Sequence, residues 1–151
     1  MIGITGTIGA GKGSIVELLT RRHGFAHYSV REYLSDIIRE REMPLVRESM
    51  RVIANELRAH HGAAHIVDTL CARAFAEGCG EGAGAGAGTG KISGAVIESV
   101  RTVGEVRALR SHGATLIAVD AEPKLRYDRI VSRASETGAS VDAAWLCGLR
   151  V

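Results

Sequence analysis

The chain has 151 residues, 46% of them hydrophobic and 24% charged, which is the size and balance of one ordinary globular domain spanning residues 1–151. Its formal net charge is only +2, and no cluster of Lys and Arg is interleaved with aromatic residues, so a main role in nucleic-acid binding is not expected. No apolar run approaches the roughly 20 residues of a membrane helix and the N-terminus lacks a signal-peptide layout, so we expect a cytoplasmic protein without a membrane partner.

A glycine-rich stretch, GTIGAGKGS at residues 6–14, directly follows an apolar segment at residues 1–5 that is predicted to form a buried strand. Apolar residues then recur at helical spacing, so strand, loop and helix follow one another as a phosphate-binding loop requires. Glycines let backbone N–H groups close around a polyphosphate, the helix N-terminus adds partial positive charge, and Lys12 can reach the outer phosphates. The sequence therefore predicts that the chain binds a nucleotide.

A second short strand is predicted at residues 25–28, and a helix follows it. Ser29 and Glu32 have the Ser-x-x-Glu spacing of a capping box, so this helix should begin near residue 30. A charged run before Pro44 should end it.

Two further helices are indicated in the middle of the chain. Apolar residues keep helical spacing over residues 50–57 and again over residues 63–74, with Gly62 between them as a stop signal. Residues 78–90 then alternate mainly between Gly and Ala, a composition that buries too little apolar surface to offset its backbone entropy. We predict a flexible surface loop there.

The last third of the chain returns to alternating strands and helices. Strands are predicted at residues 95–100 and 115–119, and Thr102 with Glu105 makes a second capping box for the helix between them. Another helix should begin near residue 123. Short strands alternating with helices predict an α/β fold, a three-layer sandwich with a parallel sheet, whose phosphate loop lies at the carboxyl ends of the strands.

The third predicted strand ends in Glu98-Ser99-Val100-Arg101, at the same sheet edge as the loop. Phosphoryl transfer needs a carboxylate that holds Mg²⁺ through its waters and a fixed cation for the accepting or leaving phosphate. Glu98 and Arg101 are candidates for these two roles. The alternative is an ordinary strand end with a solvated ion pair.

Three arginines, Arg126, Arg129 and Arg133, share one face of the last predicted helix. Stacked guanidinium groups repel one another unless an anion lies among them, and a polyphosphate is one such anion. The neighbouring carboxylates of Asp128 and Glu136 are the alternative.

Three segments together resemble the P-loop nucleoside-monophosphate kinases of the adenylate kinase and dephospho-coenzyme A kinase group: the loop at 6–14, the Glu-Ser-Val-Arg strand end and the sequence DRIVSR at 128–133. The Gly-Lys-Gly-Ser ending is like that of adenylate kinases, whereas Ile8 is more like dephospho-coenzyme A kinases. The sequence ANELR at 54–58, followed by Gly62, is more narrowly similar to kinase-like ATPases that are also found joined to deoxycytidylate deaminase domains. The resemblance spans essentially the whole chain.

The resemblance implies an enzyme that transfers a phosphoryl group from ATP, with Mg²⁺, to a nucleotide or nucleotide-like acceptor. By position, Lys12 would neutralise the β- and γ-phosphates, Arg101 would grip the acceptor phosphate and Arg133 would contact the transferring phosphates. Arg129 would stack on the ATP base within a lid-like segment that begins near residue 126. The loop residues expected around the phosphates are Gly9, Ala10, Gly11, Lys12, Gly13 and Ser14.

The metal and acceptor sites follow from the same resemblance. The candidate metal residues are Ser14 and Glu98. The Ser14 hydroxyl comes one position later than in the commonest phosphate loops. Glu98 stands where the kinases of this group usually have aspartate. The helices between residue 30 and about residue 61 would form the acceptor region. Their possible phosphate contacts, which the sequence does not rank, are Arg31, Arg39 and Arg58.

Two expectations concern the class of protein and its extent. The alternative to a kinase is a catalytically weak nucleotide-binding regulatory module that associates with a nucleotide-metabolism enzyme such as a deaminase. The resemblance to this kinase group also implies a further strand and helix after residue 141. The sequence of residues 142–151 instead indicates an interrupted lid or helix. We therefore expect the sheet to lack its last strand and helix.

Overall fold

Four short apolar segments pair side by side as a parallel sheet in the computed structural model of the chain, which describes residues 1–79 and 93–137. The strands are β1 (Ile2–Gly6), β2 (Phe25–Ser29), β3 (Gly94–Glu98) and β4 (Thr115–Val119). Their order in the sheet is β2-β3-β1-β4. The predicted parallel sheet is thus confirmed, with β1 in the interior and the phosphate loop at its carboxyl end.

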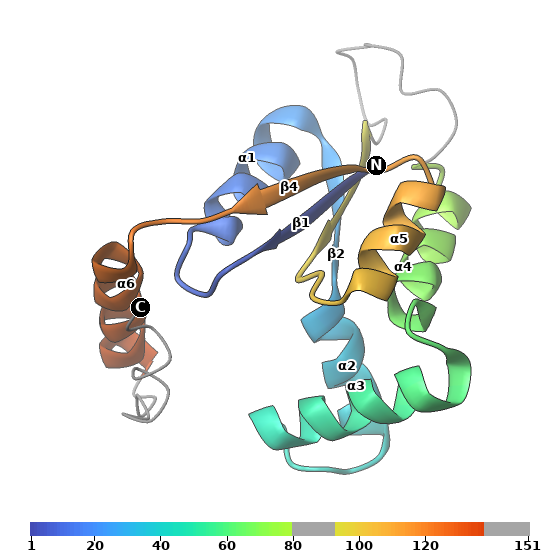
Figure 1. The fold of residues 1–151 in the computed structure, drawn as a ribbon, viewed down its shortest axis with the longest axis horizontal. Helices are drawn as coiled ribbons and strands as arrows, with labels where there is room; N and C mark the ends of the chain where they lie inside the picture. The colour runs from blue at the N-terminus through green and yellow to red at the C-terminus, as the bar shows by residue number, and fades with distance from the viewer. Residues whose placement is uncertain (80–92, 138–151) are drawn as a thin grey trace.

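Helices cover both faces of this sheet (Figure 1). Successive side chains of a strand point to opposite faces. On one face Ile4 and Val96 pack with Val16 of α1 (Lys12–His23). On the other face Ala95 and Ile97 join the larger core, which α4 (His65–Ala76) and α5 (Val103–Ser111) cover. Burial on both faces explains why these strands read as nearly continuous apolar runs.

Two helices, α2 (Val30–Glu40) and α3 (Arg47–His61), extend beyond the carboxyl end of the sheet (Figure 1). The Ser29 hydroxyl accepts a hydrogen bond from the Glu32 N–H at 3.3 Å, so the predicted cap does begin α2. The apolar faces of α2 and α3 meet at Ile38 and Ile53, which are almost fully buried. The helices predicted between residues 30 and 61 therefore form a layer above the strand ends.

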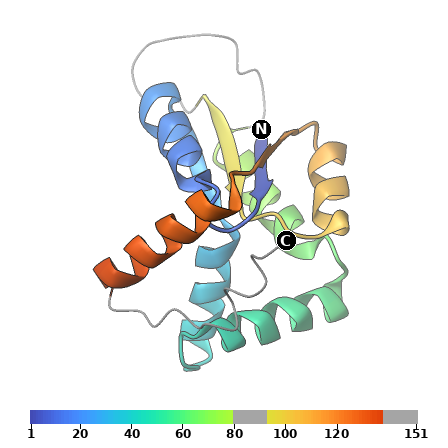
Figure 2. The ribbon, with the colours of Figure 1, turned by 60° about the vertical axis from the view of Figure 1, so that its left-hand side comes forward.

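The last described helix, α6 (Pro123–Thr137), follows β4 and begins beside the turn between β1 and α1 (Figure 2). A Cβ added to Gly9 would lie 2.6 Å from the Arg126 carbonyl oxygen, so the first turns of α6 pack directly on the glycine-rich loop. The segment that we expected to be lid-like from about residue 126 is helical as far as residue 137.

The end of the third strand and the burial of Cys79 differ from the prediction. The third strand begins at Gly94 and ends at Glu98 instead of Val100, because Ser99 has a φ of 74° in the left-handed region and turns the chain out of the strand. The Gly/Ala segment was expected to be a surface loop from residue 78, and residues 78 and 79 do follow the end of α4, but Cys79 is buried and its N–H donates to the Ala74 carbonyl at 2.9 Å. The rest of that segment, and the predicted interruption at 142–151, lie outside the described residues.

Within residues 1–79 and 93–137, no helix has both the length and the apolar composition needed to cross a membrane.

The start of the loop depends on glycine at position 6. Gly6 has a φ of 137°, and an added Cβ would overlap the Val119 carbonyl oxygen of β4. We expect Gly6→Ala to lower the free energy of unfolding by about 2 kcal/mol or more, because both the backbone conformation and the neighbouring strand resist the change. Urea unfolding measures this free energy.

Gly13→Ala is the matched control for this glycine. A Cβ at Gly13 would meet no atom of residues 1–79 or 93–137 within 4 Å, and the position lies in α1, so the free energy of unfolding should stay constant or rise by up to about 1 kcal/mol. Equal stabilities of the two variants would show that β1 and β4 do not approach as closely as the structure has them.

Candidate functional site

The glycine-rich loop and the start of α1 are built to receive an anion. Gly9 and Gly11 have positive φ values of 74° and 99°, which glycine adopts readily. Gly11 caps α1 without a side-chain hydrogen bond, and the first turn of α1 has no acidic residue. The first N–H groups of a helix have no partner within the helix and carry partial positive charge, so a phosphate would satisfy them.

Lys12 lies over this loop and holds its carbonyl groups. Its Nζ donates to the carbonyl oxygens of Thr7 at 2.7 Å and Gly6 at 3.1 Å. Partial burial lowers the pKa of Lys12, the positive charges of Arg101 and Arg133 lower it further, and the carboxylate of Glu98 opposes them. Glu98, Arg101 and Arg133, which act on this pKa, are three of the charged residues that the sequence singled out.

A cavity of about 400 Å³ lies between the loop and α6. The Arg129 guanidinium donates from Nη1 to the Gly9 carbonyl oxygen at 3.2 Å across one side of it. The cavity thus brings together several of the residues predicted to contact ATP. Its lining consists of Gly9, Gly11, Ser14, Asp128, Arg129, Ser132 and Arg133.

The predicted three-arginine face is only partly formed at this cavity. Arg126 does not line it, and its Nε instead lies 3.8 Å from Asp120 Oδ1, with 13% of the side chain exposed. Asp128 lines the cavity beside the other two arginines, whereas the Glu136 side chain lies outside the described part of the structure. Arg126 lies on α6 as the helical spacing predicts, but its guanidinium lies near Asp120, the residue after β4, and not at the cavity.

Glu98 lies at the sheet edge beside the loop and faces a histidine. Its Oε2 is 3.1 Å from His27 Nε2 on the neighbouring strand β2. This hydrogen bond lowers the pKa of Glu98, with the Lys12 charge helping, and the same bond raises the pKa of His27. Sequence reasoning missed His27 because its position depends on the register of β2 and β3. Ser29 stands level with Glu98, and His27 lies two residues earlier on the same face of β2.

A second residue that sequence reasoning missed is Asp120, directly after β4. Its Oδ1 accepts the hydroxyl of Thr7 at 2.5 Å and the N–H of Ala121 at 2.9 Å, and the Thr7 bond lowers its pKa. Asp120 therefore ties the phosphate loop to the end of β4. A carboxylate one residue after a predicted strand was the available signal.

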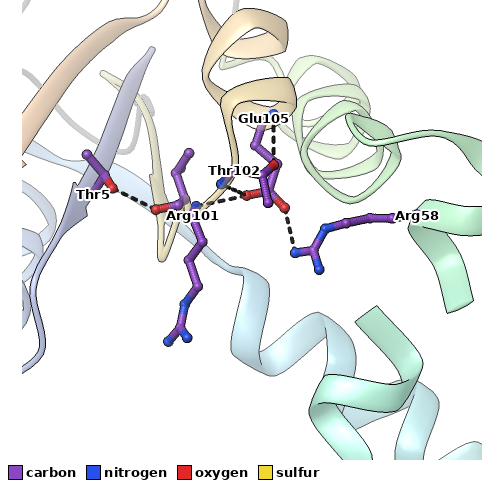
Figure 3. Close-up of polar contacts among 6 residues, drawn as sticks. Thr5, Arg58, Arg101, Thr102 and Glu105 are labelled. Atoms are coloured by element: carbon purple, nitrogen blue, oxygen red, sulfur yellow. Dashed lines mark hydrogen bonds and ion pairs between the residues drawn. The ribbon is translucent and has the colours of Figure 1, made fainter. Parts of the chain in front are cut away.

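A carboxylate on α5 organises the segment that follows β3 (Figure 3). Glu105 accepts the Arg101 N–H at 2.8 Å and forms an ion pair with Arg58 at 2.8 Å, while the Arg101 side chain extends away from it. Both bonds of the predicted capping box between Thr102 and Glu105 are present. Arg101 is thus held by its main chain, with its guanidinium exposed.

The three candidate acceptor arginines now differ in surroundings. Arg39 forms an exposed ion pair with Asp36 at 2.8 Å one turn away on α2, and Arg31 is exposed at the start of the same helix. Arg58 is instead held by Glu105 beside the Arg101 main chain. Its position makes Arg58 the best placed of the three to act together with Arg101.

The donor set is compatible with Mg²⁺ bound together with a nucleotide. Among the residues that the structure describes, no three His, Cys, Asp or Glu side chains come together as a metal site. Magnesium bound with nucleotides commonly uses one or two protein oxygens, several waters and the phosphates themselves. The ionised Glu98 could hold such an ion through water, and Ser14 offers a hydroxyl at the cavity.

Comparison with known proteins agrees with this architecture. A family model described as an AAA domain matches residues 2–142. The chain is also 31% identical over 136 residues to a protein of Sulfurisphaera tokodaii that is named UPF0200 protein. That match covers 88% of this chain and 66% of the relative, so the chain spans just under two thirds of the length of the relative.

Proposed function

This chain belongs to the AAA domain family, and from that premise we propose that it transfers the γ-phosphoryl group of ATP to a nucleotide or nucleotide-like acceptor. One observation carries the proposal. The loop that holds the Lys12 ammonium group has the cavity lined by Arg129 and Arg133 on its α6 side, and Glu98 and Arg101 lie at the end of the neighbouring strand β3. A phosphoryl donor on one side of Lys12 and an acceptor on the other would meet at its ammonium group.

The donor would bind between the loop and α6. Phosphates at the loop would receive hydrogen bonds from the N-terminal N–H groups of α1, and Lys12 would exchange two neutral carbonyl partners for charged phosphate oxygens. The Arg129 guanidinium already reaches over the loop, where it could stack on a base, and Arg133 lines the same cavity. These residues bind and orient ATP.

The transfer itself requires no protein nucleophile. An acceptor oxygen forms a bond to the γ-phosphorus while the bond from that phosphorus to the β,γ-bridging oxygen breaks, and ADP leaves. Lys12, Arg101 and Arg133 would neutralise the charge that is shared among the phosphates, and holding both substrates in line supplies much of the acceleration. Mg²⁺ bound with ATP would add further charge neutralisation.

An acceptor panel tests this proposal. We expect ADP formation from ATP and Mg²⁺ to rise at least about tenfold when the correct acceptor is added, because only a positioned acceptor completes the reacting geometry. The panel consists of the ribo- and deoxyribonucleoside monophosphates and dephospho-coenzyme A, with the corresponding nucleosides as controls that lack the phosphate. ADP release is measured by a coupled assay.

The opposite outcome of the panel also has a defined meaning. Tight ATP binding without acceptor-dependent ADP across the panel would contradict the kinase and favour the regulatory module of a nucleotide-metabolism enzyme. A nucleoside that served as well as its monophosphate would contradict the role of Arg101 at an acceptor phosphate.

A further inference from the structure

Glu105 has more hydrogen-bonding partners than a helix cap needs. Its Oε2 accepts the N–H groups of Arg101 at 2.8 Å and Thr102 at 3.0 Å, and its Oε1 accepts Nη2 of Arg58 at 2.8 Å (Figure 3). A capping box accounts for the Thr102 bond alone. The side chain is 0% exposed, so its charge is fully buried. A buried carboxylate is costly unless it is paired, and here one carboxylate joins two separate elements.

The main chain at residues 100–102, which Glu105 holds, also has a hydrogen bond to β1. The Thr5 hydroxyl of β1 donates to the Val100 carbonyl oxygen at 2.7 Å, one residue before Arg101 (Figure 3). The main chain at 100–102 is therefore tied to β1, which leads into the phosphate loop, and to α5. The Arg101 guanidinium therefore extends from a main-chain segment that is held by hydrogen bonds on both sides.

Arg58 brings α3 to the same carboxylate. Its side chain is 21% exposed, and its Nε is buried without a hydrogen-bond partner among the described residues. The ion pair therefore leaves part of the guanidinium accessible and does not satisfy all of its donors. A residue that served only to anchor α3 would gain nothing from this incomplete pairing, whereas an anion beside Arg101 could use the remaining charge.

We propose that Glu105 is a positioning residue for the acceptor, which sets the Arg101 main chain and the Arg58 guanidinium in one fixed relation so that both arginines meet the same anionic group. This inference rests on the proposed function and names the partner of Arg101 within it. Binding of a phosphate group would then depend on Glu105 although Glu105 does not touch it.

Inorganic phosphate is the probe for this proposal, with the loop first saturated by a non-hydrolysable ATP analogue. In the protein labelled with ¹⁵N-arginine, phosphate should shift the Nε–H signals of Arg58 and Arg101 with one common dissociation constant. Glu105→Gln should weaken this binding at least about tenfold and uncouple the Arg58 signal, because the amide loses the ion pair. Phosphate that does not shift both signals in the unaltered protein would overturn the proposal.

Glu56→Gln is the matched control on α3, the helix that carries Arg58. Glu56 pairs with Arg41 at 2.8 Å, but both side chains are well exposed, so its loss should leave phosphate binding unchanged. Folded Glu105→Gln that binds phosphate as well as the Glu56→Gln control would reduce Glu105 to a helix cap and overturn the proposal.

A double variant covers the possibility that Glu105→Gln does not fold. Arg58→Gln combined with Glu105→Gln can keep a neutral hydrogen bond between α3 and α5, so we expect it to fold and still lose about tenfold in phosphate affinity. Unaltered affinity would overturn the proposal. The acceptor panel distinguishes failure of this inference from failure of the proposed function. Acceptor-dependent ADP formation in the unaltered protein, together with unchanged phosphate binding in Glu105→Gln, contradicts only this inference. The absence of acceptor-dependent ADP formation contradicts the proposed function.

Discussion

Lys12→Ala is expected to weaken ATP binding by roughly 100-fold. Lysine contacts to phosphate are charge-assisted hydrogen bonds, and losing those made to the outer phosphates should cost about 3 kcal/mol of binding free energy. Among the residues that the structure describes, the lysine bonds only with the Gly6 and Thr7 carbonyls, both of them exposed contacts. The fold should therefore tolerate the change.

Calorimetric titration with ATP and Mg²⁺ measures this effect, and urea unfolding measures stability in parallel. Lys124→Ala is the matched control, because it removes the same charge from an exposed position on α6 that does not line the cavity. We expect the Lys124 variant to bind ATP as the unaltered protein does. A Lys12 variant with unchanged affinity would refute the phosphate-loop assignment.

Arg101→Ala is expected to lower kcat/KM for the acceptor by about 100-fold to 1000-fold, with ATP affinity largely kept. A preorganised donor aimed at developing charge is worth this much in known active sites. Arg101 stands at the strand ends, held through its main chain by Glu105, whereas the proposed ATP cavity lies between the loop and α6. Its loss should therefore act on the acceptor side.

Steady-state kinetics with the acceptor found in the panel, together with ATP titration, measure the two effects separately. Arg107→Ala is the control, since Arg107 is exposed farther along α5 and should leave both constants unchanged. Loss of ATP affinity with an unaltered KM for the acceptor would show that Arg101 contacts ATP and that its assignment to the acceptor is wrong.

The parts of the site that were predictable are those written in local sequence. The loop at 6–14 is a contiguous pattern, and the carboxyl-end location of Glu98 and Arg101 follows from the alternation of strands and helices. Glu105 was recognised as a cap because its partner Thr102 is three residues away. Local spacing determines these contacts, so no knowledge of packing was needed.

The parts that were not predictable depend on which elements become neighbours. His27 meets Glu98 only once β2 pairs with β3, and Arg58 meets Glu105 across 47 residues of sequence. The left-handed conformation of Ser99, which ends β3 early, is rare for a residue other than glycine and has no sequence signal. Tertiary packing decides these features.

In the proposed reaction, a phosphoryl group passes from ATP to an acceptor beside Lys12. Incubation with ATP labelled in the γ-phosphate, Mg²⁺ and the acceptor panel tests it most directly, because the position of the label separates transfer from hydrolysis. We predict label in one phosphorylated acceptor, in an amount equal to the ADP formed. Label recovered only as inorganic phosphate, or only as unreacted ATP, would contradict the claim.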